Sequence, residues 1–408
     1  TAQKREQHVL ISPVWQCGRE HRQRKGKGKM ENKKNILVVD DSALMRRLIS
    51  DIINSDGRFQ VSDLAVNGLE AFDLVTRDPK RYEAILLDIN MPKMNGIQFL
   101  EQLGKMKIRQ KVIVVSTLAK EGAAETVRCL ELGAFDFVTK PDSYMEARND
   151  MFRQMLLTAL GAATGVDIGI PAKDAPKAGA VKGTKTGSGI SASKALYDIT
   201  ASPVKRTPHK SVGGSAKKLV ALACSTGGPK ALQSVIPKLP GGLDAPMVLV
   251  QHMPVGFTKS LAERLNEMSQ VKVKEAAEGD VLKKGTVYIA QGGSQLRIVK
   301  KGSDYVITEN ADEPARGGLK PCADIMYESL LDSDFDDITC VVLTGMGGDG
   351  TLGIKQLNNK KNIYVIAQNE ATCTVYGMPR VVAEAGLVDE VVPLDSVADA
   401  ITKNVGVH

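Results

Sequence analysis

Short, continuous runs of apolar residues recur along the chain, separated by longer segments of mixed polarity. The first group comprises I-L-V-V (36–39), a weaker strand-like segment (60–64), A-I-L-L (84–87), V-I-V-V (112–115) and F-D-F-V (135–138). Runs of β-branched residues that do not alternate with polar ones are typical of parallel strands covered by helices on both faces. Residues 35–150 are therefore predicted to form a doubly wound α/β domain.

The same pattern returns in the C-terminal half of the chain. Its runs are L-V-A-L-A (219–223), M-V-L-V (247–250), T-V-Y-I-A (286–290), T-C-V-V-L (339–343) and I-Y-V-I-A (363–367). They again predict parallel strands that alternate with helices. Residues 216–408 should form a second α/β domain built on a parallel sheet.

Two segments lack the pattern. Residues 151–215 are rich in Gly, Ala, Ser, Pro and Lys and carry too few bulky apolar residues to bury a core, which predicts a flexible interdomain linker. Residues 1–34 show no apolar periodicity and are predicted to be a disordered basic extension. Met30 directly precedes the structured sequence and is the expected natural start, with a basic anchoring arm as the alternative for the residues before it.

The net charge of +7 is distributed unevenly along the chain. The extension carries 10 basic and 3 acidic residues and the linker 9 and 3, whereas the predicted domains carry 15 against 18 and 20 against 23. The basic excess therefore lies outside both domains, so neither has the charge expected of a nucleic-acid-binding surface.

Cysteine usage and hydropathy bear on the compartment. The six cysteines show no C-x-x-C spacing and lie mostly in apolar segments, which favours reduced core thiols over disulfides or a zinc site. No apolar run approaches the roughly 20 residues of a membrane helix, and the N-terminus lacks a signal-peptide core. We expect a cytoplasmic protein without membrane insertion.

Acidic residues follow two strands of the first domain. Asp40 and Asp41 come directly after one strand in V-V-D-D-S, and Asp88 follows another in L-L-D-I-N-M-P. The carboxyl ends of parallel strands meet in a crevice where the strand order reverses, so these carboxylates should converge. Such an all-oxygen site suits Mg²⁺. For any one of them, the alternative is a helix N-cap or an ordinary surface charge.

Two more polar residues fall at strand ends, Ser116 after V-I-V-V and Lys140 in F-V-T-K-P. A lysine, a hydroxyl and a cation around a carboxylate can receive a phosphoryl group because they counter the charge on its oxygens. Asp88 is the predicted acceptor.

These motifs, from residue 35 to about 143, resemble a response-regulator receiver domain, which has a flavodoxin-like fold. The family usually has Asp where this chain has Asn95, a difference expected to matter little. The resemblance implies phosphorylation of Asp88 by a chemotaxis histidine kinase, Mg²⁺ held by Asp40, Asp41 and Asp88, phosphate contact by Lys140, and a switch pair of Ser116 and Phe137.

The first strand of the second domain runs into C-S-T-G-G-P, which places Ser225 on a tight strand-to-helix turn. Such a turn exposes a hydroxyl and directs backbone N–H groups outward, as a nucleophile elbow does. Ala223 occupies the first glycine position of G-x-S-x-G, so the motif is incomplete. Glycine turns after strands also bind phosphates, although the P-loop pattern is absent.

Histidine is scarce, and only His252 lies inside the second domain rather than in the extension, the linker or at the terminus. It follows the strand M-V-L-V in Q-H-M-P and is the available base for serine chemistry. Asp349, in L-T-G-M-G-G-D-G, follows a third strand and could orient the imidazole toward Ser225. The alternatives for Asp349 are an N-cap of the helix from Thr351 or a metal ligand.

Together, S-T-G-G-P, Q-H-M-P-V-G-F-T and L-T-G-M-G-G-D-G resemble the catalytic domain of chemotaxis protein-glutamate methylesterases, the CheB family, as does V-Y-G-M-P-R (375–380). The chain departs from the family at Cys224, where Ala or Ser is more usual. It also departs in G-G-L-K-P-C-A-D (317–324), where the family commonly has an Arg- or His-containing segment ending P-S-V-D.

The resemblance implies demethylation of glutamate methyl esters on methyl-accepting chemotaxis receptors, with methanol as product, and deamidation of receptor glutamines. Ser225, His252 and Asp349 would be catalytic, backbone N–H groups near Thr226 and Met346 would stabilise the oxyanion, and the catalytic domain would need no cofactor. The receiver is expected to cover the Ser225 edge until Asp88 is phosphorylated. A silent receptor-docking adaptor and a DNA-binding regulator are the alternatives.

Overall fold

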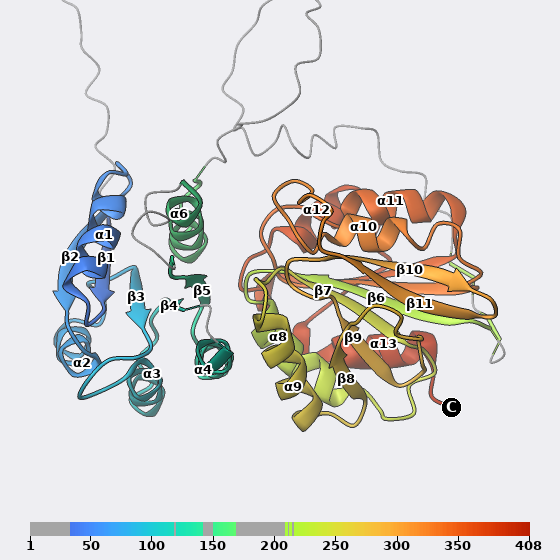
Figure 1. Ribbon diagram of the computed structural model, residues 1–408, viewed down its shortest axis with the longest axis horizontal. Coiled ribbons are helices and arrows are strands. Elements are labelled where there is room, and N and C mark those ends of the chain that lie inside the picture. The colour runs from blue at the N-terminus through green and yellow to red at the C-terminus, as the bar shows by residue number, and fades with distance from the viewer. Residues whose placement is uncertain (1–32, 118–119, 142–149, 169–208, 211, 214–215) are drawn as a thin grey trace, which may run out of the picture. The chain divides into compact units, whose positions relative to one another are not determined.

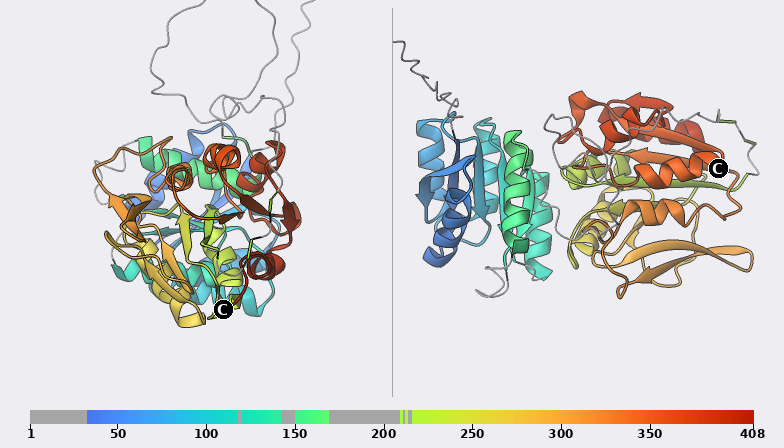
Figure 2. Two further views of the ribbon diagram at one scale, coloured as in Figure 1. Left: turned by 90° about the vertical axis from the view of Figure 1, so that its right-hand side faces the viewer. Right: turned by 90° about the horizontal axis from the view of Figure 1, so that it is seen from above.

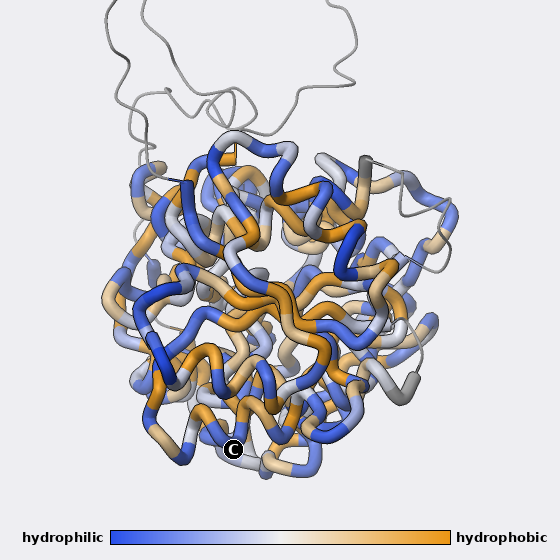
Figure 3. The backbone as a smooth tube through the Cα atoms, turned by 90° about the vertical axis from the view of Figure 1, so that its left-hand side faces the viewer, coloured by the Kyte–Doolittle hydropathy of each residue, from blue (hydrophilic) through white to orange (hydrophobic). Residues whose placement is uncertain are grey.

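The computed structural model describes residues 33–117, 120–141, 150–168, 209–210, 212–213 and 216–408. The predicted basic extension and most of the predicted linker lie outside these residues. Two parallel sheets, each with helices on both faces, make up the described chain (Figures 1 and 2). Hydrophobic residues are concentrated along their strands (Figure 3). Within the described residues, no helix is both long and apolar enough to cross a membrane.

The first sheet has five parallel strands in the order β2-β1-β3-β4-β5, which is the flavodoxin-like order. Its strand order reverses at β1 and β3, so the carboxyl ends of these strands flank the crevice where ligands bind in such sheets. The strands are β1 (Lys34–Val39), β2 (Phe59–Ala65), β3 (Ala84–Asp88), β4 (Val112–Ser116) and β5 (Asp136–Thr139).

Helices cover both faces of this sheet. Residues of α1 and α6 form one core with alternate strand residues, and residues of α2, α3 and α4 form the other core on the opposite face. The helices are α1 (Ala43–Asn54), α2 (Gly68–Arg77), α3 (Gly96–Lys105), α4 (Lys120–Glu131) and α6 (Asp150–Thr164).

The predicted linker boundaries were wrong at both ends. Helix α6 begins at residue 150, and its Phe152, Leu156 and Leu160 are buried in the first domain. At the other end, His209 Nε2 lies 3.0 Å from Asp337 Oδ1, at the start of a strand of the second domain. The predicted boundaries follow the average composition of the whole segment, which conceals the bulky apolar residues of α6 at one end and a single histidine contact at the other.

The second sheet has seven parallel strands in the order β14-β13-β12-β6-β7-β9-β8. It lies between two layers, one with α8, α9 and α13 and the other with α10, α11, α12 and the antiparallel hairpin β10–β11 (Figure 1). The strands are β6 (Lys218–Cys224), β7 (Met247–Gln251), β8 (Lys272–Glu275), β9 (Thr286–Ile289), β10 (Gln295–Lys301), β11 (Asp304–Asn310), β12 (Asp337–Val342), β13 (Ile363–Gln368) and β14 (Glu390–Val392).

Most helices of this domain connect successive strands, and α13 follows the last strand. They are α8 (Gly228–Val235), α9 (Phe257–Met268), α10 (Ala323–Glu328), α11 (Thr351–Lys360), α12 (Met378–Glu384) and α13 (Val397–Val405), with 3₁₀ turns η1 (Ile236–Lys238), η2 (Glu370–Thr372) and η3 (Leu394–Ser396). The five apolar runs predicted as strands correspond to β6, β7, β9, β12 and β13. Both edge strands and the hairpin lack such a run, which is why the sequence did not indicate them.

Candidate active site

Strands β12, β6 and β7 are neighbours at the centre of the second sheet. Ser225 directly follows β6, His252 directly follows β7, and Asp349 lies in the loop after β12. The strand order therefore brings the three predicted residues to one edge of the sheet, although they are far apart in sequence. The His252 N–H donates to Cys224 O at 3.3 Å, so the backbones at the ends of β6 and β7 are in contact.

The Ser225 turn is held by backbone hydrogen bonds. Ser225 N donates to Thr344 O at 3.0 Å, and Gly228 N donates to Ser225 O at 2.7 Å. Gly227 has a φ of 76°, a left-handed conformation that glycine adopts without strain, and α8 begins directly after it. A Cβ on Gly345 would lie 2.8 Å from the Ser225 Cβ, so only glycine allows the two loops to approach this closely.

The His252 ring is fixed by Asp349. His252 Nε2 lies 2.8 Å from Asp349 Oδ2, and the two side chains are only 11% and 2% exposed. Because Nε2 faces the carboxylate, Nδ1 is the ring nitrogen left for Ser225. Within the described residues, no hydrogen bond joins the Ser225 hydroxyl to the ring, so the structure completes the histidine–aspartate half of the predicted arrangement only.

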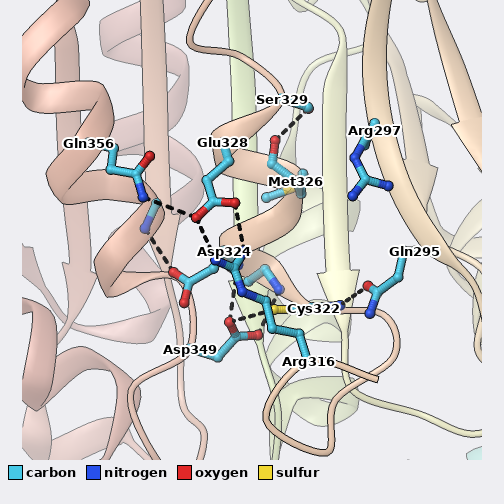
Figure 4. A network of polar contacts seen from close by, with 12 residues as sticks. Gln295, Arg297, Arg316, Cys322, Asp324, Met326, Glu328, Ser329, Asp349 and Gln356 are labelled. Atoms are coloured by element: carbon cyan, nitrogen blue, oxygen red, sulfur yellow. Dashed lines mark hydrogen bonds and ion pairs between the residues drawn. The ribbon is translucent and has the colours of Figure 1, made fainter. Parts of the chain in front are cut away.

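Asp349 rests on the N-terminus of α10 (Figure 4). Its Oδ2 also accepts from Ala323 N at 2.7 Å, and its Oδ1 accepts from Asp324 N at 3.0 Å, Gly350 N at 2.9 Å and the Cys322 thiol at 3.1 Å. Two oxygens thus receive five donors, counting His252. Such a saturated carboxylate is a fixed negative charge rather than a free ligand.

The electrostatics agree with this geometry. Burial by itself would raise the pKa of Asp349, but the hydrogen bond and charge of His252 and the N–H groups of Ala323 and Asp324 outweigh it and lower the pKa to about 2. Burial and the neighbouring Asp349 charge raise the pKa of Asp324 to about 6. Of the two buried acids, Asp349 therefore stays ionised to the lower pH.

Both alternative roles of Asp349 fit less well. The N-cap of α11 is Gly350, and no side chain caps that helix, so Asp349 is not its cap. Cys322, Asp324 and Asp349 each place one ligand atom within 4.8 Å of the others, a spacing that a metal could use. However, N–H and S–H donors already surround the Asp349 carboxylate, and these occupy the lone pairs that a metal would need.

The V-Y-G-M-P-R motif supports the loop that contains Met346. Gly345 N donates to Val375 O at 3.1 Å, and Gly377 N and Met378 N both donate to Gly345 O, at 3.1 and 2.9 Å. The motif therefore holds the Gly345–Met346 backbone, where an oxyanion donor was predicted. The sequence pattern does not predict this role, because a match of residues alone does not say which loop they contact.

In the first domain, the predicted carboxylates converge. Asp40, Asp41 and Asp88 each place one oxygen within 4.8 Å of the others, and Lys140 Nζ lies 2.8 Å from Asp88 Oδ1 and 2.9 Å from Asp40 Oδ2. Burial raises the pKa of Asp88 in spite of Lys140. Asp41 is exposed, whereas the other two carboxylates are buried. An all-oxygen donor set that is open to water on one side fits hydrated Mg²⁺.

The remaining predicted receiver residues have contacts with other parts of the first domain. The Ser116 hydroxyl accepts from Thr126 Oγ1 at 2.7 Å and lies 3.2 Å from Gly122 O, so it is bonded within the loop and helix that follow β4. Phe137 is half-buried against the domain core. Asn95 is the N-cap of α3 and forms a capping box with Gln98, a role that Asp would also fill.

The first domain thus has the converging carboxylates and the lysine expected of a phosphoacceptor receiver, and the second has the histidine–aspartate pair expected of a serine hydrolase at the same sheet edge as the serine turn. This combination defines a response regulator with an enzymatic output domain. The description "Response regulator receiver domain" matches residues 36–149, and "CheB methylesterase" matches residues 220–401. The chain belongs to the CheB family of protein-glutamate methylesterases.

Several proteins are similar to this chain over most of its length or over one of its domains. A Bacillus subtilis protein is 38% identical over 369 residues, which cover 90% of this chain and 97% of that protein. A Syntrophomonas wolfei protein is 37% identical over 372 residues, covering 90% and 98%. Both are named protein-glutamate methylesterase/protein-glutamine glutaminase. The crystal structure of the Thermotoga maritima CheB methylesterase catalytic domain is 37% identical, with a TM-score of 0.45, and covers 46% of this chain and 98% of that one.

Proposed function

We propose that this chain hydrolyses glutamate methyl esters on methyl-accepting chemotaxis receptors, releasing methanol, and deamidates receptor glutamines by the same acyl chemistry. The observation that carries the proposal is the 2.8 Å contact between His252 Nε2 and a saturated Asp349, beside the Ser225 turn. Relatives that cover 90% of the chain are named for both activities, which favours an enzyme over a silent adaptor or a DNA-binding regulator.

The reaction divides into acylation and deacylation. Ser225 Oγ attacks the γ-carbonyl carbon while His252 Nδ1 takes the hydroxyl proton. The tetrahedral intermediate collapses as His252 returns that proton to the leaving methoxide or amide nitrogen, which departs as methanol or ammonia. Water then attacks the γ-glutamyl ester of Ser225, with His252 again as base. Asp349 holds the ring and stabilises the imidazolium in both halves.

The oxyanion of each tetrahedral intermediate needs donors beside Ser225. Backbone N–H groups of Thr226 and Met346 are the proposed donors, and each is typically worth on the order of 3 kcal/mol. Two contacts favour them: the Ser225 turn bonds to Thr344 O, and the loop from Thr344 to Met346 is held by Val375.

The receiver would regulate this chemistry. Asp88 is the proposed phosphoryl acceptor from a chemotaxis histidine kinase, and Lys140 would contact the phosphoryl oxygens. Asp40, Asp41 and Asp88 would hold Mg²⁺, which when bound counters the charge on those oxygens. Ser116 and Phe137 would respond as the switch pair. We propose that the protein works in the cytoplasm, where it would encounter the kinase and the receptors. We also propose that the unphosphorylated receiver covers the sheet edge at Ser225.

A serine-directed fluorophosphonate probe tests the catalytic proposal on the full chain. Wild type should be labelled and should release methanol from methylated receptors. Ser225→Ala should fold normally, judged by its circular dichroism and melting temperature, and should lose labelling and methanol release by several orders of magnitude. Labelling of His252→Ala at the wild-type rate would sink the assignment of His252 as base.

A further inference from the structure

A buried amide links the serine turn to the histidine. Gln251 is the last residue of β7, it directly precedes His252, and it is 2% exposed. Its Nε2 donates to Ser225 O and to His252 O, both at 3.1 Å. The side-chain NH₂ group of Gln251 thus donates its two hydrogens to the main-chain oxygens of Ser225 and His252, the two residues that the proposed mechanism uses.

The orientation of this amide follows from its partners. Two carbonyl oxygens can be bonded only by the amino group, because the amide oxygen cannot donate. The amide oxygen in turn accepts from the thiol of Cys224 at 3.1 Å, and Cys224 is the register partner of Gln251 on β6. All three polar contacts of the side chain therefore agree on one orientation.

The adjacent helix leaves room for the amide only because it begins with glycine. A Cβ on Gly228 would lie 1.9 Å from Gln251 Oε1, far inside van der Waals contact. The second glycine of S-T-G-G-P, Gly228, and the glutamine of Q-H-M-P, Gln251, are therefore in close contact, which the two motifs do not indicate on their own. Any larger residue at 228 would displace the Gln251 side chain.

The hydrogen bonds to Ser225 O also fix the orientation of the next N–H group, that of Thr226. Ser225 O accepts from Gln251 Nε2 at 3.1 Å and from Gly228 N at 2.7 Å. In a trans peptide the C=O and the following N–H point in opposite directions because the unit is planar. Directing Ser225 O toward Gln251 therefore aims the Thr226 N–H the opposite way, and this N–H is a proposed oxyanion donor.

We propose that Gln251 is a positioning residue that aligns the Ser225–Thr226 peptide, and with it an oxyanion donor, relative to the His252 main chain. The inference rests on the proposed roles of Ser225, His252 and Thr226. It assigns Gln251 no contact with substrate. Its effect is on the rate of the acyl step, because a misaimed donor weakens transition-state binding more than substrate binding.

The test compares variants of the full chain in their reaction with a fluorophosphonate probe, with rates expressed per active site. Gln251→Met keeps the length of the side chain and removes both donors. Since loss of a whole oxyanion donor costs about 10²–10³ in rate, misaiming one should lower the maximal phosphonylation rate about 10- to 100-fold. The half-saturating probe concentration should change less than about twofold.

A matched control removes a buried polar contact elsewhere. Thr339 is fully buried within β12, and its hydroxyl accepts from Asn404 Nδ2 at 2.7 Å. Thr339→Val should lower the melting temperature but leave the rate per site unchanged. If Gln251→Met does not fold, Gly228→Ala replaces it, because this change displaces the amide without removing it.

The outcomes separate this inference from the proposed function. If Ser225→Ala is labelled like wild type, the nucleophile assignment is wrong. If Ser225→Ala is not labelled but Gln251→Met reacts at a rate within twofold of wild type, the assignment of Ser225 as nucleophile is supported and the proposed role of Gln251 is overturned. An equal loss of rate in Thr339→Val would also overturn it, because the effect would then reflect general packing.

Discussion

Asp349→Asn gives the sharpest test of the charge relationships at the site. The change keeps the shape of the side chain but replaces one acceptor oxygen with an amino group, which would face N–H donors from Ala323, Asp324 and Gly350 or from His252. It also removes the charge that would stabilise the imidazolium. We expect both the stability and the activity to fall.

The magnitude follows from the pKa of Asp349. Folding lowers this pKa from 3.8 to about 2, and a shift of about two pKa units corresponds to about 2 to 3 kcal/mol of stability. Because the folded pKa is depressed, this contribution is fully present above pH 4 and is lost as the pH falls toward 2. Loss of the charged orienting carboxylate should lower kcat by up to about 10⁴-fold.

Two measurements check this prediction. Urea denaturation at pH 7 should give the loss of stability of Asp349→Asn relative to wild type, and methanol release should give the loss in kcat. Asp337→Asn is a matched control, since Asp337 is also 2% exposed and contacts a histidine, His209, at the other end of the sheet. The reasoning is refuted if Asp349→Asn keeps kcat within tenfold of wild type, or if Asp337→Asn loses as much.

Three further predictions concern other parts of the chain. Gly345→Ala should lower activity at least tenfold and reduce stability, because the added Cβ would lie 2.4 Å from Met378 Sδ and 2.8 Å from Ser225 Cβ; wild-type methanol release would contradict this. Asp88→Asn should abolish phosphoryl incorporation from acetyl phosphate in Mg²⁺ and any accompanying rise in esterase rate, and incorporation that persists would exclude Asp88 as acceptor. Leu156→Ala should lower the free energy of unfolding of the receiver by about 2 to 5 kcal/mol, measured by urea denaturation, whereas a linker position would give no change.

Much of the fold could be predicted because buried parallel strands have an apolar signature that is independent of their partners. The edge strand β8, K-V-K-E, buries only Val273 and carries no such signature. Helix α6 was missed for a related reason, since its amphipathic residues follow a boundary that was inferred from composition alone. Elements that depend on tertiary contacts are the ones that sequence patterns do not indicate.

The site was predictable to a similar degree. In the first sheet, Asp88 and Lys140 lie at strand ends, and in the second, His252 follows β7 while Asp349 lies in the loop after β12. The strand order of each sheet accounts for the convergence within that domain. The Q-H-M-P motif does not predict a role for Gln251, because only the packed structure shows that its amide faces Ser225 O. The available signal for such a role was that Gln251 is a polar residue at the carboxyl end of the otherwise apolar strand β7.

The contact between His209 and Asp337 determines where the polypeptide enters the output domain. Asp337 is the first residue of β12, and Asp349 lies in the loop after the last one. The six residues of β12 span about 20 Å, at about 3.3 Å per residue. The covalent connection from the receiver thus reaches the sheet at the amino ends of its strands, and the chemistry lies at the carboxyl ends. A pull on this connection would therefore act on His209 and Asp337, at the end of the sheet opposite to Ser225, before it reached the candidate active site.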